Sequence, residues 1–194
     1  MENFSDEVRS AADELRRIEA DRDLALARSR KVVRLSKRVI HDVHTGSAVG
    51  DDVAGLEAAM AELMSVEAPE IRGSSLVQDA AMEYAEAMLL LSLVTSGRVP
   101  SHSDLGISAA AWVLGLADCV GELRRILTRD LMDGRVDSAM ATLEMMEGIS
   151  GELMLLDVPD AVAPVRRKQD IVRGIMDRTR SDMTIASMMS LKTD

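Results

Sequence analysis

The chain has 194 residues and a formal net charge of −10, with 23 Lys and Arg residues against 33 Asp and Glu. This length predicts one domain over residues 1–194, and the acidic balance argues against a protein that coats polyanions through overall positive charge. The single cysteine excludes an intrachain disulfide and a zinc site built from several cysteines. Aromatic residues make up only 2 % of the chain, while Ala, Leu, Met, Glu and Arg are abundant, which predicts an all-α fold.

The first predicted element is a long helix over residues 4–45, because this stretch contains no Pro or Gly and ends at the stop signal Thr45-Gly46. Asp51 and Asp52 are typical of a helix N-cap, and Pro69 ends the helix that follows them. Further Gly and Pro residues divide the rest of the chain. The pattern predicts a bundle of about six helices, over residues 4–45, 51–66, 70–95, 106–132, 136–156 and 162–183.

The charges are unevenly distributed along these helices. Residues 45–123 hold 2 basic and 12 acidic residues, whereas residues 28–44 are locally basic. Most of the cations in this segment follow i, i+3 and i+4 spacing, so they share one helix face. Such a stripe can bind phosphates even in a net-acidic protein, although a solvated helix face is the plainer interpretation. The candidate nucleic-acid-binding residues, called the basic stripe below, are Arg30, Arg34, Lys37, Arg38, His41 and His44.

Two predicted helices are apolar on nearly every side except for one pair of carboxylates each. Glu83 and Glu86 are three residues apart, and Asp118 and Glu122 are four apart, so each pair shares a helix face. Helices that are apolar all round are normally interior, and buried carboxylates need compensation. No Lys or Arg lies between residues 72 and 98 or between 98 and 124.

Two such pairs facing each other would raise carboxyl pKa values or require a cation, and carboxylate ligands suit Mg²⁺ or Mn²⁺ rather than zinc. The sequence therefore predicts a metal site that activates water against a phosphodiester or phosphoanhydride. The alternative is that the four carboxylates face solvent or pair with arginines from other helices. The candidate arginines are Arg124, Arg129, Arg166 and Arg173.

Three segments resemble the translin family. Residues 112–125, which include Leu114-Gly115-Leu116-Ala117-Asp118 and Gly121-Glu122-Leu123, are similar to a segment of translin-associated factor X. Glu83-Tyr84-Ala85-Glu86 resembles the Glu-Tyr-x-Glu motif on the preceding helix of that family, and residues 30–46 are similar to its basic first helix. The chain departs from the family at Trp112, where the family usually has Tyr.

The resemblance implies a translin-like bundle that assembles into a hollow homo-oligomer, typically an octamer, with nucleic acid enclosed. It also implies a Mg²⁺-dependent endoribonuclease acting on single-stranded RNA, with single-stranded DNA as a further ligand. Translin itself lacks the acidic set, so the chain is similar to the catalytic type of subunit. Eukaryotic complexes mix two subunit types, whereas single-chain archaeal-type members assemble with themselves. The catalytic and metal-binding positions that match are Glu83, Glu86, Asp118 and Glu122.

Three other functions compete with this interpretation. A non-catalytic RNA- or DNA-binding scaffold would keep the fold without the activity. An all-α nucleotide pyrophosphatase also uses Glu-x-x-Glu, but its second pair is Glu-x-x-Asp, unlike Asp118-x-x-x-Glu122. A ferritin-like di-iron protein needs Glu-x-x-His, which no histidine here supplies. The N-terminus has no apolar signal region and no uncharged stretch is long enough to span a bilayer, which predicts a cytoplasmic protein without a membrane partner.

Overall fold

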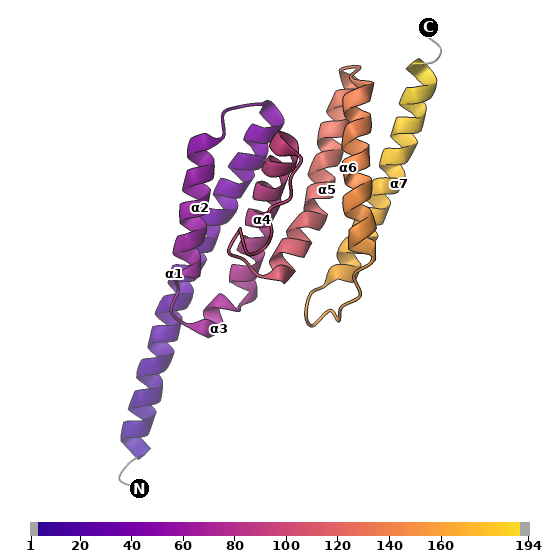
Figure 1. Cartoon of the computed structure of the whole chain (residues 1–194). Coiled ribbons are helices and arrows are strands. Elements are labelled where there is room, and N and C mark those ends of the chain that lie inside the picture. Colours follow the sequence, from indigo (N-terminus) through magenta and orange to yellow (C-terminus); the bar gives the residue numbers. More distant parts are fainter. Residues whose placement is uncertain (1–3, 191–194) are drawn as a thin grey trace.

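The computed structural model describes residues 4–190, and within this range every regular element is a helix (Figure 1). The predicted all-α fold is therefore confirmed, with a long first helix at the predicted bounds. None of the described helices is apolar enough over a sufficient length to cross a bilayer. The helices are α1 (Phe4–Thr45), α2 (Gly50–Met64), α3 (Pro69–Arg72), α4 (Ser75–Ser96), α5 (Ala109–Met132), α6 (Val136–Met154) and α7 (Val165–Ser190).

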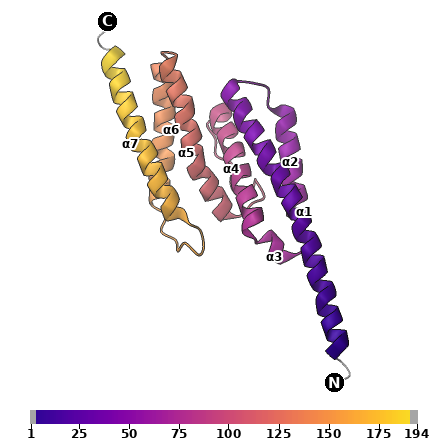
Figure 2. The ribbon, with the colours of Figure 1, turned by 180° about the vertical axis from the view of Figure 1, so that it is seen from behind.

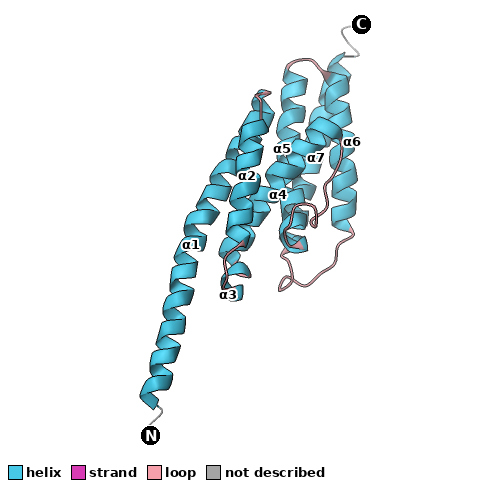
Figure 3. Cartoon of the chain, turned by 60° about the vertical axis from the view of Figure 1, so that its left-hand side comes forward, coloured by secondary structure: helices cyan, strands magenta, loops and turns pink. Residues whose placement is uncertain are grey.

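Helices α4 and α5 lie in the middle of the molecule (Figures 1 and 2). Helix α1 packs against α2 and α4, α4 packs against α5, and α5 packs against both α6 and α7. The N-terminal half of α1 projects past the other helices, which is clear from the side in Figure 3. The two central helices hold much of the core, because both are apolar on several faces.

The contact between α4 and α5 is unusually close at Gly115. A Cβ atom built on Gly115 would lie 2.6 Å from Ala85 Cβ and 2.7 Å from the main-chain oxygen of Met82. Ala85 itself is fully buried. The two helices can approach this closely only because residue 115 has no side chain, and this approach brings Glu86 of α4 next to the acidic face of α5.

The helix predicted over residues 70–95 is in fact two helices, α3 and α4. Ser74 has extended backbone angles (φ −69°, ψ 156°), and its hydroxyl donates a hydrogen bond of 2.6 Å to the main-chain oxygen of Ile71. The neighbouring Gly73 and Ser74 are weak helix formers, so this local bond suffices to interrupt the helix. The described residues thus contain seven helices instead of about six.

The predicted helix ends are partly confirmed. Gly46 and Gly134 adopt left-handed angles (φ 70° and 73°) directly after helix ends, as their stop signals predict. Asp51 and Asp52 lie within the first turn of α2 and do not cap it, although two carboxylates there still favour the helix dipole. Helix α5 begins at Ala109 because Ser108 caps it, accepting a hydrogen bond from the Ala111 main-chain N–H. Helix α7 begins after Pro164 and extends beyond its predicted end.

Candidate nuclease site and basic groove

The two acidic pairs face each other across the α4–α5 contact. Each helix presents its pair on one face, and all four side chains are partly buried. The pKa of Glu86 is raised to about 8, first by burial and then by the charges of Asp118, Glu83 and Glu122, against the lowering effect of Lys168. Because the charges of all three other carboxylates raise the pKa of Glu86, the four acids interact electrostatically and are called the acidic cluster below.

Two side chains from the outer helices hold the α5 half of this cluster. The ammonium of Lys168, on α7, donates to both carboxylate oxygens of Asp118, at 2.5 and 2.6 Å. His44, in the last turn of α1, donates from Nε2 to the Glu122 carboxylate. A weaker contact of 3.8 Å joins the Arg125 guanidinium to Glu122. The α5 carboxylates are therefore fixed in orientation before any ligand arrives.

The arginines that the sequence offers as alternative partners are all engaged elsewhere within residues 4–190. Each binds a group outside the acidic cluster, whereas the hydrogen bonds to the α5 carboxylates come from Lys168 and His44. Arg124 pairs with Asp182, Arg129 with the main-chain oxygen of His44, Arg166 with Asp157, and Arg173 with Asp170.

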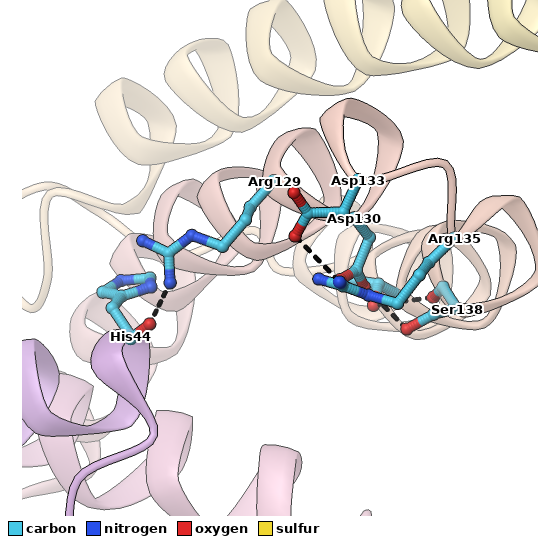
Figure 4. Close-up of polar contacts among 7 residues, drawn as sticks. His44, Arg129, Asp130, Asp133, Arg135 and Ser138 are labelled. Atoms are coloured by element: carbon cyan, nitrogen blue, oxygen red, sulfur yellow. Dashed lines mark hydrogen bonds and ion pairs between the residues drawn. The ribbon is translucent and has the colours of Figure 1, made fainter.

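His44 is placed differently from the rest of the basic stripe. It is only 4 % exposed, and its Nδ1 atom has no hydrogen-bond partner, which suits the tautomer with the proton on Nε2. Figure 4 shows the Arg129 guanidinium reaching the main-chain oxygen of His44. The final turn of α1 is thus covered by α5, so His44 supports Glu122 and does not share the exposed face of the stripe.

The other labelled residues in Figure 4 form a structural network at the end of α5. The buried Asp130 accepts hydrogen bonds from Arg135 at 2.7 and 3.0 Å and from the Ser138 hydroxyl at 2.6 Å. Arg135 also pairs with Asp133 at 2.8 Å. These contacts fix the turn between α5 and α6 and so hold the C-terminal half of α5 in place.

An open pocket of about 430 Å³, called the acidic pocket, gives access to the cluster. Three of the four carboxylates line it, those of Glu83, Glu86 and Glu122, whereas Asp118 lies behind them, paired with Lys168. Cations border the same pocket; they are Lys37 and His41 from α1 and Arg125 from α5. The pocket therefore combines acidic walls with a basic rim.

The donor chemistry of the acidic pocket fits Mg²⁺, which prefers oxygen ligands. Within the described residues no group of three His, Cys, Asp or Glu side chains is arranged around a single point that could hold an ion. Mg²⁺ usually takes one or two carboxylates directly and completes its shell with waters and phosphate oxygens. Glu83 and Glu86 have room for such a mixed shell, since they line the pocket and no ion pair among the described side chains engages them.

Cys119 is the one thiol near the cluster, but it is a core residue. It is fully buried, and its Sγ donates a hydrogen bond of 3.1 Å to the main-chain oxygen of Glu86. Burial and the neighbouring carboxylates raise the pKa of this thiol well above its ordinary value. A thiol in this state is inert, so the predicted structural role agrees with its surroundings.

A second pocket of about 430 Å³, called the basic groove, runs between α1 and α4. Arg30, Arg34 and Lys37 of the basic stripe line it, opposite Leu76 and Asp79 of α4. Lys37 also borders the acidic pocket, so the two pockets share one lining residue.

The remaining members of the stripe have separate surroundings. Arg38 turns toward α2 and pairs with Asp52 at 2.9 Å. His41 is exposed at the rim of the acidic pocket. The exposed members of the basic stripe that border the groove or the pocket are therefore Arg30, Arg34, Lys37 and His41.

Two functional contacts were not predictable from the residue pattern. Lys168 lies 50 residues after Asp118, and its only distinction in the sequence is that it is the one lysine between Lys37 and Lys192. The contact between His44 and Glu122 spans 78 residues. Both depend on how the helices pack, α7 directly against α5 and α1 against α4, which the sequence pattern of either helix does not specify.

Comparison with known proteins identifies relatives. No family model matches the chain. An uncharacterized protein of Methanocaldococcus jannaschii is 34 % identical over 102 residues, which are 52 % of this chain and 46 % of that protein. The chain thus matches less than half the length of this curated relative.

Solved structures match over nearly the whole chain. The crystal structure of AfC3PO has a TM-score of 0.83 and 33 % identity, covering 95 % of this chain and 99 % of that one. A complex of AfC3PO with duplex RNA has a TM-score of 0.82 and 32 % identity, covering 95 % and 98 %. Apo-NeC3PO, at 21 % identity, a TM-score of 0.82 and coverage of 92 % and 96 %, shows the shared fold alone. The chain therefore belongs to the translin family, as an archaeal-like relative of the translin/TRAX-type C3PO proteins.

Proposed function

We propose that this protein is a Mg²⁺-dependent endoribonuclease that cleaves single-stranded RNA inside a hollow homo-oligomer. The observation that carries the proposal is that the basic groove and the acidic pocket share Lys37 as a lining residue. A cationic groove binds a phosphate backbone, and carboxylates bind the ions that activate water against it. Together they place a polyanion beside a site suited to its hydrolysis.

Each part of the site then has a role. Glu83, Glu86, Asp118 and Glu122 would hold Mg²⁺, or Mn²⁺ in its place. The bound ion supplies Lewis acidity toward a phosphate oxygen and lowers the pKa of a coordinated water. Lys168 and His44 keep the α5 carboxylates oriented.

The path of the RNA is supported by the order of the cations. Arg30, Arg34, Lys37 and His41 follow one another toward the acidic pocket along α1. On the far side, Arg125 borders both the acidic pocket and a further pocket of about 440 Å³ that includes Thr128. A backbone lying in this direction would meet cations before and after the carboxylates. AfC3PO, which is similar over nearly its whole length, forms a complex with duplex RNA.

Self-assembly is supported by apolar side chains that the single chain leaves uncovered. Phe4 is 73 % exposed, and Val8 and Leu15 follow it on the same face of the projecting half of α1. Large exposed apolar residues in such a row are typical of an interface between subunits. We propose an octamer that encloses the acidic pocket, as the family resemblance implies, acting in the cytoplasm.

The proposal is tested with the purified protein and labelled single-stranded and duplex RNA. We expect cleavage of the single strand with Mg²⁺, none with EDTA, and at least a 100-fold slower reaction for Glu122→Ala with RNA binding retained. Activity that survives Glu122→Ala would indicate another site or a contaminant. Binding without any metal-dependent cleavage would favour the scaffold function, and hydrolysis of nucleoside triphosphates without RNA cleavage would favour the pyrophosphatase.

The basic groove is tested separately by reversing two of its charges. Arg34→Glu with Lys37→Glu is expected to weaken binding of single-stranded RNA by roughly 10- to 100-fold at low salt, because two phosphate contacts become repulsions. The matched control, Arg167→Glu with Arg178→Glu, makes the same charge change at exposed positions of α7 outside the groove. Equal affinities for the two double variants, measured by fluorescence anisotropy, would remove the groove from the RNA path.

A further inference from the structure

Lys168 occupies an unusual position for a lysine. Its ammonium lies against Asp118 with two short hydrogen bonds, and the two side chains are only 21 % and 26 % exposed. Lysines are seldom this buried unless they are paired, because removing an ammonium from water is unfavourable. The same charge acts on Glu86 across the cluster. Lys168 is therefore the positively charged side chain that compensates part of the acidic cluster in the folded protein.

The neighbours of Lys168 show that this placement is built into the fold. Gln169, the next residue, donates from Nε2 to the main-chain oxygens of Leu153 and Leu156, at 2.8 Å each. These bonds fasten the start of α7 to the end of α6. Arg166, two residues earlier, is exposed and pairs with Asp157 on the surface. Lys168 thus points toward the cluster from a backbone position that these hydrogen bonds fix, whereas Arg166 lies on the surface.

We propose that Lys168 is a positioning residue that serves as a resident cation, orienting Asp118 when no divalent ion is present and yielding Asp118 oxygens when one binds. An ammonium and a divalent ion compete for the same carboxylate lone pairs, and Lys168 engages both oxygens of Asp118. The inference rests on the proposed metal site. It adds that Lys168 keeps the empty site folded and weakens its affinity for metal.

The first arm of the test needs no metal. In EDTA, Lys168→Met is expected to lower the melting temperature by several degrees, because Asp118 is left among like charges without its cation. Adding Asp118→Asn to Lys168→Met should restore most of that loss, since the uncompensated carboxylate is then removed. Arg166→Met, on the exposed face of the same helix, is the matched control and should change little. An unchanged melting temperature for Lys168→Met, or no rescue by Asp118→Asn, would refute the role of Lys168 as a resident cation.

The second arm measures metal affinity with Mn²⁺, following the free ion by electron paramagnetic resonance. Lys168→Met is expected to bind Mn²⁺ about 10-fold more tightly than the unaltered protein and to gain more thermal stability from it. If Lys168→Met is unfolded in EDTA, folding on addition of Mn²⁺ supports the same inference. Equal or weaker Mn²⁺ binding by Lys168→Met would overturn the proposed exchange, in which the metal ion replaces Lys168 at the Asp118 oxygens. If neither protein binds Mn²⁺, the proposed metal site and the exchange both fail, while rescue in the first arm still identifies the resident cation.

Discussion

Replacing Glu86 by Gln is expected to stabilise the protein at alkaline pH while it abolishes RNA cleavage. Glu86 has a pKa of about 8 in the folded chain, raised by burial and by three nearby carboxylates from its ordinary value of 4.5. Between these two values the unfolded chain has released the proton that the folded chain retains. Stability contributed by this group therefore falls as the pH rises from 4.5 to 8. Gln cannot ionise, so the variant escapes this loss.

The difference is expected to reach ~2–4 kcal/mol at pH 8.5 and to vanish near pH 4, because each pKa unit corresponds to about 1.4 kcal/mol before discounting for partial exposure. The measurement is urea unfolding in EDTA across this pH range. Glu144→Gln, on the exposed surface of α6, is the matched control and should not alter the pH profile. Parallel profiles for Glu86→Gln and the unaltered protein would mean that folding does not raise the pKa of Glu86.

The same Glu86→Gln variant is expected to cleave RNA at least 100-fold more slowly in Mg²⁺, because it loses an anionic ligand at the wall of the acidic pocket. A gain in stability combined with a loss of activity is the behaviour of a group retained for function. Cleavage at an undiminished rate would exclude Glu86 from the metal site, whatever the unfolding data show.

Gly115→Ala is expected to destabilise the chain by ~2–3 kcal/mol, which is the upper part of the usual range of ~1–3 kcal/mol for inserting a methyl group into a tightly packed contact. The added Cβ would meet Ala85 Cβ at 2.6 Å and the Met82 oxygen at 2.7 Å, so α4 and α5 must separate. Because Glu86 and Asp118 lie on either side of this contact, separation should also slow cleavage. Chemical denaturation gives the stability change, and the nuclease assay gives the change at the site.

The matched control for this prediction is Gly148→Ala, inside α6. A Cβ at Gly148 meets nothing within 4 Å, so the higher helix propensity of Ala should stabilise the chain by ~0.5–1 kcal/mol. Opposite signs for two identical substitutions would locate the effect in the α4–α5 contact. A Gly115→Ala variant as stable as the unaltered protein would show that the two helices can move apart freely.

Most of the helices, and the helix face that each acidic pair shares, could be predicted from the sequence, because both depend on local signals. Helix ends follow from Gly46 and Gly134, whose backbone angles are left-handed. The proximity of Glu86 to the α5 acids follows from two helices that are apolar on several faces and must pack on each other. The break at Ser74 escaped prediction because it depends on a single hydroxyl contact in an otherwise helical stretch.

The compensation of the acidic cluster could not be predicted, because it depends on contacts between distant helices. The sequence offers several arginines as partners, yet Arg124 and Arg129 bind other groups and Lys168 takes Asp118. His44 belongs to the basic stripe by its spacing, but it is buried and the Glu122 and Arg129 side chains of α5 contact it. Helical periodicity identifies a shared face and does not say which neighbour covers it.

The continuity of α1 has a mechanical consequence. A helix of 42 residues is roughly 60 Å long, and this one carries exposed apolar side chains near its projecting end, the basic stripe toward its C-terminal end and His44, which contacts Glu122, in its final turn. It packs against α2 and α4. A small tilt of the projecting end would therefore be transmitted along the helix to the orientation of the Glu122 carboxylate.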